Sequence, residues 1–204
     1  MLRLPTVPRV HLLPVLVVVL TCAFTAARAQ DITRAPGEND LTFATRALHL
    51  TSDAEPHVTA ANWNGVPTLF VDYQTSGEYP ERPIVALQRQ PSGRYHAFQV
   101  TLGEQEGGTP DLAALGFARA DHGSPAKDLI VILSWDVKHA TVSGTLYEVR
   151  IFAPPQPGQT AFTLLDISKK FGSECECTWD DGTSKIFRFK TIAAVKAELK
   201  RLGY

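Results

Sequence analysis

The segment LIVILSW, Leu129–Trp135, is an apolar run with a single polar residue. Short apolar runs without polar alternation are typical of strands that are buried on both faces. Sixty residues earlier, Leu69–Tyr73 (LFVDY) resembles Leu129–Leu133 (LIVIL). Each run is followed by a second strand, a turn with glycine and a third strand. We therefore expect two related hairpin units, 66–102 and 127–165.

Turn sequences divide the rest of the chain into further hairpins. Asn64-Gly65 stands between His57–Trp63 and Val66–Tyr73, and it is a strong two-residue hairpin signal. Pro91-Ser92-Gly93 separates two more strands, and 180–184 (DDGTS) separates a last pair. Most of the chain is therefore predicted to form antiparallel strands.

Two segments carry helix signals. Thr109-Pro110-Asp111 combines an N-cap residue with a proline at the first helical position. Thr191 is a second N-cap, and apolar residues at helical spacing follow it: Ile192, Val195, Leu199 and Leu202. The predicted class is β-rich α+β, with antiparallel hairpins forming a sheet or small sandwich. Residues 175–204 are expected to form a hairpin plus a C-terminal amphipathic helix.

The first 29 residues have the three parts of a secretory signal peptide. Arg3 and Arg9 supply a positive start, Leu12–Ala26 is apolar, and Ala27-Arg28-Ala29 is a small-x-small cleavage site. The apolar part is shorter than the roughly 20 residues that a membrane-spanning helix needs. We expect an exported protein, periplasmic or secreted, whose residues 30–204 form one mature domain without membrane insertion. An uncleaved membrane anchor is the alternative.

The composition is that of an ordered globular chain. It is 44% hydrophobic and 20% charged, with a formal net charge of −1. The predicted signal peptide holds three arginines and no acid, so the mature chain is more acidic still. Dedicated nucleic-acid-binding domains usually carry a basic excess, and we therefore expect no nucleic-acid partner.

One stretch resembles a known family of repeats. Gly116–Asp121 (GFARAD), followed by Asp128–Val131 (DLIV), is similar to the FG-GAP or VCBS-type β-propeller blade of many exported proteins. The resemblance covers residues 66–166 and implies blade-like hairpins around a calcium loop. Between Asp121 and Asp128, however, the loop reads HGSPAK. Two carboxylates do not supply the six to eight oxygens that Ca²⁺ takes, so we expect no metal and no cofactor.

The number of units bears on their packing. Two blade-like units cannot close a propeller, which typically has four or more blades. The two units are therefore expected to pack as a small sandwich, unless the likeness reflects only general hairpin patterning.

Common catalytic motifs are missing from the sequence. It contains no G-x-S-x-G, H-E-x-x-H, G-x-x-x-x-G-K-[ST] or G-x-G-x-x-G. The leading prediction is a non-enzymatic binding protein for a protein or a glycan, with Trp63, Tyr79 and Trp135 as aromatic anchors. Core packing is the alternative role for each of these three residues. The alternative function is a hydrolase whose site is assembled from distant residues such as Asp136 and His139.

A short pattern occurs twice. Ser76–Tyr79 (SGEY) and Ser92–Tyr95 (SGRY) share an S-G-x-Y sequence. The pattern is similar to the serine-glycine loop with which small periplasmic lysozyme inhibitors plug an enzyme cleft. An enzyme inhibitor is therefore a further alternative, although Ser-Gly is also common turn chemistry.

Cys175 and Cys177 are the two cysteines that remain after removal of the signal peptide. An oxidising compartment favours a disulfide between them. Residues two apart on a regular strand lie at the outer edge of bridging distance, so a bulge or turn is expected at Glu176. Metal binding, redox activity and an intermolecular bond are the alternatives.

Cleavage after Ala29 would make Gln30 the first residue of the exported protein. We expect intact mass spectrometry of the protein from its native envelope to give the mass of residues 30–204. A species that retains Met1, or one that begins at a lipidated Cys22, would contradict the predicted export signal.

Overall fold

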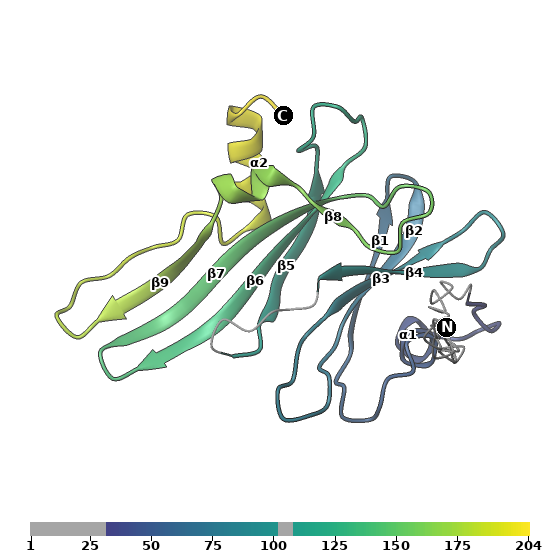
Figure 1. Cartoon of the computed structure of the whole chain (residues 1–204), viewed down its shortest axis with the longest axis horizontal. Helices are drawn as coiled ribbons and strands as arrows, with labels where there is room; N and C mark the ends of the chain where they lie inside the picture. The colour runs from purple at the N-terminus through teal and green to yellow at the C-terminus, as the bar shows by residue number, and fades with distance from the viewer. Residues whose placement is uncertain (1–31, 102–107) are drawn as a thin grey trace, which may run out of the picture.

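Two antiparallel sheets make up the molecule, and helices pack against them (Figure 1). The computed structural model describes residues 32–101 and 108–204, so the predicted signal peptide, residues 1–29, lies outside the described residues. In chain order the elements are α1 (Asp40–Ala47), β1 (His57–Trp63), β2 (Val66–Asp72), β3 (Ile84–Arg89), β4 (Tyr95–Thr101), β5 (Asp111–Ala118), β6 (Asp128–His139), β7 (Val142–Ala153), β8 (Thr163–Leu164), the 3-10 helix η1 (Asp166–Lys170), β9 (Ser173–Trp179) and α2 (Ile192–Arg201). The predicted class, β-rich α+β with a C-terminal helix, is confirmed.

The first sheet is a meander in the order β1-β2-β3-β4. Its first turn is the predicted one, because Asn64 and Gly65 connect β1 to β2 with φ angles of 51° and 84°. Positive φ at both positions is what this kind of two-residue hairpin turn requires. Helix α1 covers the outer face of this sheet, where Phe43 is fully buried against Leu69 and Val71.

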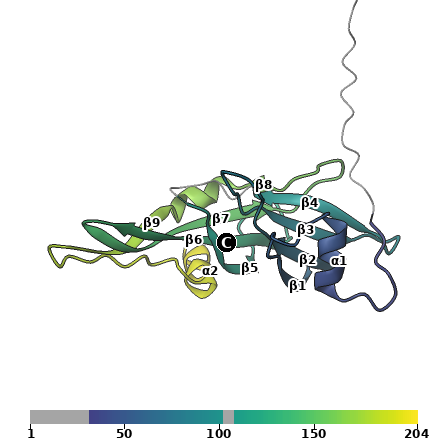
Figure 2. The same cartoon turned by 90° about the horizontal axis from the view of Figure 1, so that it is seen from below.

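The second sheet has the order β5-β6-β7-β8, and β9 also pairs with β7. Strand β8 pairs with the end of β7 at Phe152, whereas β9 pairs with its first half, from Val142 to Glu148. Strands β6, β7 and β9 extend away from the first sheet (Figure 1). Helix α2 lies beside β5 (Figure 2), where the side chain of Ile192 packs over Gly116.

Strand β6 separates two hydrophobic cores. Between Leu129 and Trp135 the odd-numbered side chains enter the core between the sheets, whereas Ile130 and Ile132 enter a core under α2, because side chains alternate along a strand. The core between the sheets consists of Leu129, Val131, Leu133 and Trp135 with Trp63, Phe70, Ile84, Ala86, Val100, Phe152 and Phe162. The core under α2 consists of Ile130 and Ile132 with Ala120, Val149, Ile151, Phe171, Phe187, Val195 and Leu199. Burial of Leu129–Leu133 on both faces agrees with the uninterrupted apolar sequence of this part of β6.

The two tryptophans proposed as surface anchors lie in the core between the sheets. Trp63 is 1% exposed and Trp135 is 3% exposed, so core packing is confirmed for both residues and their role as surface anchors is wrong. The indole N–H of Trp63 donates to the backbone oxygen of Lys127 (2.7 Å), and that of Trp135 donates to the backbone oxygen of Gly108 (3.0 Å). Both residues can be buried because the polar group of each ring has a partner.

The helix signals gave one correct and one wrong prediction. Helix α2 begins after Thr191, whose side chain accepts a hydrogen bond from the backbone N–H of Ala194. The segment from Asp111 is strand β5 and not a helix, because its backbone pairs with β6 from Asp111 to Ala118. An N-cap residue stabilises only the first turn of a helix. Pairing with a buried strand instead provides hydrogen bonds for the backbone of a whole segment.

Cys175 and Cys177 form a disulfide in the structure, with Cα atoms 5.2 Å apart. The expected bulge at Glu176 is wrong, because every residue from Ser173 to Trp179 keeps its own partner on β7. Gly144 is the partner of Cys177 and has a φ of 153°. A Cβ atom at Gly144 would overlap the backbone oxygen of Glu176 and lie 2.7 Å from Cys177 Cα. The absence of a side chain at Gly144 therefore lets β9 approach β7 at the disulfide.

We expect Gly144→Ala to lower the free energy of unfolding by about 2–3 kcal/mol, because the added methyl group has no space against β9. Urea unfolding of the mature chain measures this loss. Ser143→Ala, an exposed neighbour on β7, is the control and should change stability by less than about 0.5 kcal/mol. A loss below roughly 1 kcal/mol in Gly144→Ala would contradict the close approach of the strands.

Candidate functional site

The loop between β2 and β3, residues 73–83, carries Tyr79. Among the large hydrophobic residues of the described chain, Tyr79 has the most exposed side chain. Tyr79 is 75% exposed at the tip of this loop, beside Gly77 and Glu78. The second S-G-x-Y copy differs, because Tyr95 is buried against Phe43 of α1, with ring centroids 4.7 Å apart. Of the three predicted anchors, Tyr79 alone lies on the surface.

Backbone and hydroxyl hydrogen bonds close the base of the loop. The N–H of Thr75 donates to the backbone oxygen of Glu81 (2.8 Å), and the N–H of Glu81 donates to Thr75 Oγ1 (2.8 Å). The Thr109 hydroxyl donates to the backbone oxygen of Pro80 (3.1 Å), the residue next to Tyr79. The loop is therefore tied to itself and to the segment that precedes β5.

Arg82 anchors the same loop through a charged cluster. Its Nε donates to Asp72 Oδ2 (3.0 Å) and its Nη1 donates to Asp111 Oδ1 (3.1 Å), so one guanidinium joins β2, the loop and β5. Its Nη2 lies 2.9 Å from Nδ1 of His57 on β1. Asp72 is 5% exposed, and a carboxylate that is buried this deeply needs such a partner. The same Nδ1 lies 3.4 Å from Asp72 Oδ2, so this ring nitrogen faces both the guanidinium and the carboxylate.

A polar groove lies at the opposite end of the first sheet, between the β3–β4 hairpin and segment 155–160. It has a volume of about 620 Å³. The residues that line it are Gln88, Gln90, His96, Phe98, Pro155, Gln156, Pro157, Gly158, Gln159 and Thr160. Because none of these is an aspartate, glutamate, lysine or arginine, the groove offers carboxamides, a hydroxyl and ring surfaces, and His96 is the one ionisable side chain in its lining.

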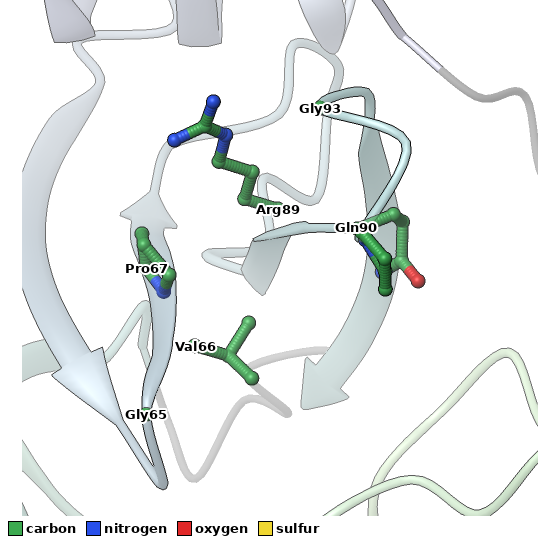
Figure 3. A pocket seen from close by; sticks show the side chains of 7 residues that line it. Gly65, Val66, Pro67, Arg89, Gln90 and Gly93 are labelled. Atoms are coloured by element: carbon green, nitrogen blue, oxygen red, sulfur yellow. The ribbon is translucent and has the colours of Figure 1, made fainter.

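A second hollow adjoins the groove at Gln90. It has a volume of about 360 Å³ and lies between the two turns at this end of the sheet. Figure 3 shows Val66 and Pro67 at the start of β2 and Arg89 at the end of β3 around this space. Arg89 gives this hollow a guanidinium group, which the groove lacks.

The loop from Asp121 to Asp128, which resembles a calcium loop, is closed by hydrogen bonds to its own two carboxylates. Asp121 Oδ1 accepts a hydrogen bond from the N–H of Gly123 (2.8 Å). Asp128 is fully buried at the start of β6, and its Oδ2 accepts a hydrogen bond from the N–H of Ala120 (2.7 Å). Burial raises the pKa of Asp128 above its usual range. These contacts give both carboxylates a structural role within the loop.

Asp136 and His139 do not form an acid–base pair. They are three residues apart on β6, so their side chains point to opposite faces of the sheet. Asp136 Oδ2 instead accepts a hydrogen bond from Lys138 Nζ at 3.1 Å. The structure thus gives no support to the acid–base pair named in the hydrolase alternative.

Metal and membrane features are also missing from residues 32–101 and 108–204. In these ranges no three His, Cys, Asp or Glu side chains gather in a way that could hold a metal ion. No helix in the same ranges has the length and apolar character needed to cross a bilayer.

The chain matches no protein family model, no curated protein and no solved structure at a significant level. Its function therefore has to be inferred from its own residues.

The sequence prediction named Tyr79, which lies on the surface, but it did not name the Arg82 cluster or the groove. The S-G-x-Y pattern and the turn residues around it marked the loop. The groove combines Gln88–Phe98 with Gln156–Thr160. Some 60 residues separate these two segments in the chain, and no local pattern connects them.

We expect the buried carboxylate of Asp128 to make stability depend on pH. Because burial raises the pKa of Asp128 in the folded protein, folding favours the protonated carboxyl. The stability that this protonated form contributes is lost as the pH rises through the raised pKa. Asp128→Asn keeps an acceptor for the Ala120 N–H and removes the charge. The variant should raise Tm at pH 7 by about 2–4 °C, which corresponds to roughly 1 kcal/mol for a chain of this size.

Thermal melting between about pH 4, near the pKa of an unfolded aspartate, and pH 7 measures this effect. The difference between Asp128→Asn and the unchanged protein should shrink as the pH falls. Asp136→Asn, at an exposed position of the same strand, is the control and should show no such trend. A Tm difference for Asp128→Asn that stays constant with pH would contradict the prediction.

Proposed function

We propose that this chain is an exported, non-enzymatic binding protein whose partner is another protein, bound through the Tyr79 loop (residues 73–83). The observation that carries the proposal is the 75% exposure of Tyr79 on a loop whose base is hydrogen-bonded. Export itself rests on the signal-like residues 1–29 of the sequence.

Tyrosine is suited to this role for physical reasons. Its ring offers a large apolar area with a polar tip, and it has only two side-chain torsions to immobilise. Tyrosines are enriched among the residues that dominate protein–protein binding energies. A single exposed aromatic between Glu78 and Pro80 fits a small pocket on a partner surface.

The anchoring of the loop supports the same proposal. Binding costs free energy when a mobile loop must become ordered. Here the contacts of Thr75 with Glu81, of Thr109 with Pro80 and of Arg82 with Asp72 hold the loop before any partner arrives. A prearranged loop of this kind favours recognition of one partner geometry.

The enzyme-inhibitor alternative is a special case of this proposal, in which the surface that receives Tyr79 is an enzyme cleft. It differs from the general case only in the partner and uses the same residues, Ser76–Tyr79. The hydrolase alternative needs different residues, and the separation of Asp136 from His139 on β6 weighs against it.

Site-specific photo-crosslinking tests the proposed interface. We expect p-benzoylphenylalanine at position 79 to give a discrete cross-linked adduct in the native envelope on irradiation. The same amino acid at position 186 is a matched control, because Ile186 is 74% exposed, close to the value for Tyr79. Position 186 should not give this adduct.

Tyr79→Ala should reduce recovery of the cross-linked partner in a pull-down at least tenfold. Because the side chain is exposed, its removal should change stability by no more than about 0.5 kcal/mol. Ile186→Ala should leave the recovery unchanged. No adduct from position 79, or the same adducts from both positions, would refute the proposal.

A further inference from the structure

We infer that the groove between the β3–β4 hairpin and segment 155–160 is a second binding site, and that it takes a neutral glycan. This site lies outside the proposed function, because it shares no residue with the Tyr79 loop. In an antiparallel meander the β2–β3 loop and the β3–β4 turn lie at opposite ends of the sheet. The groove is therefore remote from Tyr79.

Hydrogen bonds hold both walls of the groove. On one wall, β3 and β4 are paired so that Gln88 lies opposite His96. On the other wall, the N–H of Gln159 donates to the backbone oxygen of Gln156 (3.0 Å), and the N–H of Gln156 donates to Gln159 Oε1 (2.8 Å). This second wall is a tight turn that contains Gly158 at a φ of 87°.

The second wall is also fastened to the first sheet. The N–H of Gln99 on β4 donates to the backbone oxygen of Thr160 (3.1 Å), and the N–H of Phe162 donates to the backbone oxygen of Gln99 (2.9 Å). Figure 1 shows this segment, between β7 and β8, passing beside the first sheet. The ring of Phe162 stacks on Trp63 in the core, with centroids 5.2 Å apart. The groove is thus formed in advance, since core packing and backbone bonds set its width.

The lining chemistry selects a class of ligand. Each of the four glutamines carries one carbonyl acceptor and an NH₂ donor. Gln159 Oε1 already accepts from the N–H of Gln156, and Gln90 Nε2 donates to the backbone oxygen of Gln88 (3.3 Å). The donors and acceptors that these bonds leave suit hydroxyl groups, which both donate and accept. A ligand without polar groups would remove these carboxamides from water without replacing their hydrogen bonds. Apart from His96, the lining has no ionisable side chain, so a strongly charged ligand would find no carboxylate, lysine or arginine there. A neutral ligand with many hydroxyl groups meets both conditions.

Aromatic and proline rings on the two walls favour the same class of ligand. Phe98 and His96 lie side by side on the first wall, with ring centroids 4.5 Å apart, and Pro155 and Pro157 lie on the other. The C–H faces of a pyranose ring pack against such surfaces while its hydroxyl groups meet the carboxamides. The volume of about 620 Å³ lies within the range of small-molecule sites. A short neutral oligosaccharide therefore fits the groove in size, polarity and charge.

NMR titration of the mature chain tests this inference with defined probes. The neutral probes are the trisaccharides cellotriose, N,N′,N″-triacetylchitotriose, mannotriose and β-1,4-galactotriose. Trigalacturonic acid is the anionic comparison, and a polyproline decapeptide is the peptide comparison. We expect at least one neutral trisaccharide to bind with amide shifts at the groove, and at least tenfold more tightly than the anionic trisaccharide.

Two variants link any binding to the groove. Gln90→Ala combined with Gln156→Ala removes one carboxamide from each wall and should weaken the trisaccharide at least tenfold. Gln74→Ala changes a half-buried glutamine outside the groove and should have less than a twofold effect. Melting curves establish that each variant is folded. Tyr79→Ala should leave the titration unchanged, which separates this result from the test of the protein-binding proposal.

The inference is overturned if none of the four neutral trisaccharides shifts the groove amides. It is also overturned if the double variant binds as well as the unchanged chain, or if trigalacturonic acid binds as tightly as the neutral probes. Binding of the polyproline peptide without binding of any trisaccharide would assign the groove to a peptide and refute the glycan assignment.

Discussion

Strand β6 is buried on both faces, and each of its faces belongs to a different core. A shift of its pairing by one residue would exchange the two sets of side chains, so the alternation of Leu129–Trp135 constrains the register of the second sheet. The inward face of β6 receives the first sheet, and its outward face receives α2. The layers of the molecule therefore depend on one strand that has no exposed side over its first half.

Burial of this strand uses most of the large aromatic side chains. Trp63 stacks with Phe117 and Phe162 at centroid distances of 5.7 and 5.2 Å. The indole N–H groups of Trp63 and Trp135 bond to backbone oxygens from other parts of the chain. These rings stabilise the contact between the sheets and cannot also bind a partner. Recognition is then left to the loops and turns at the ends of the strands.

The two proposed binding surfaces lie at opposite ends of the first sheet. At one end, Tyr79 projects from a loop that Arg82 ties to Asp72 and Asp111. At the other end, carboxamides and rings line a groove with no acidic or basic side chain apart from His96. Both surfaces rest on hydrogen-bonded backbone, which lowers the entropy cost of binding. This arrangement would let the protein hold a protein partner and a glycan at the same time.

Local sequence signals predicted the elements whose formation depends on neighbouring residues. Asn64-Gly65 specified its turn because both positions require positive φ, and Thr191 specified the start of α2 through its own side chain. The apolar run of Leu129–Trp135 identified a buried strand because a partly exposed strand would alternate. The tertiary structure decided what depends on distant contacts: β5 is a strand because it pairs with β6, and Trp63 is buried because a second sheet covers it. The groove has the same origin, since its walls come from segments that only the packing of the two sheets brings together.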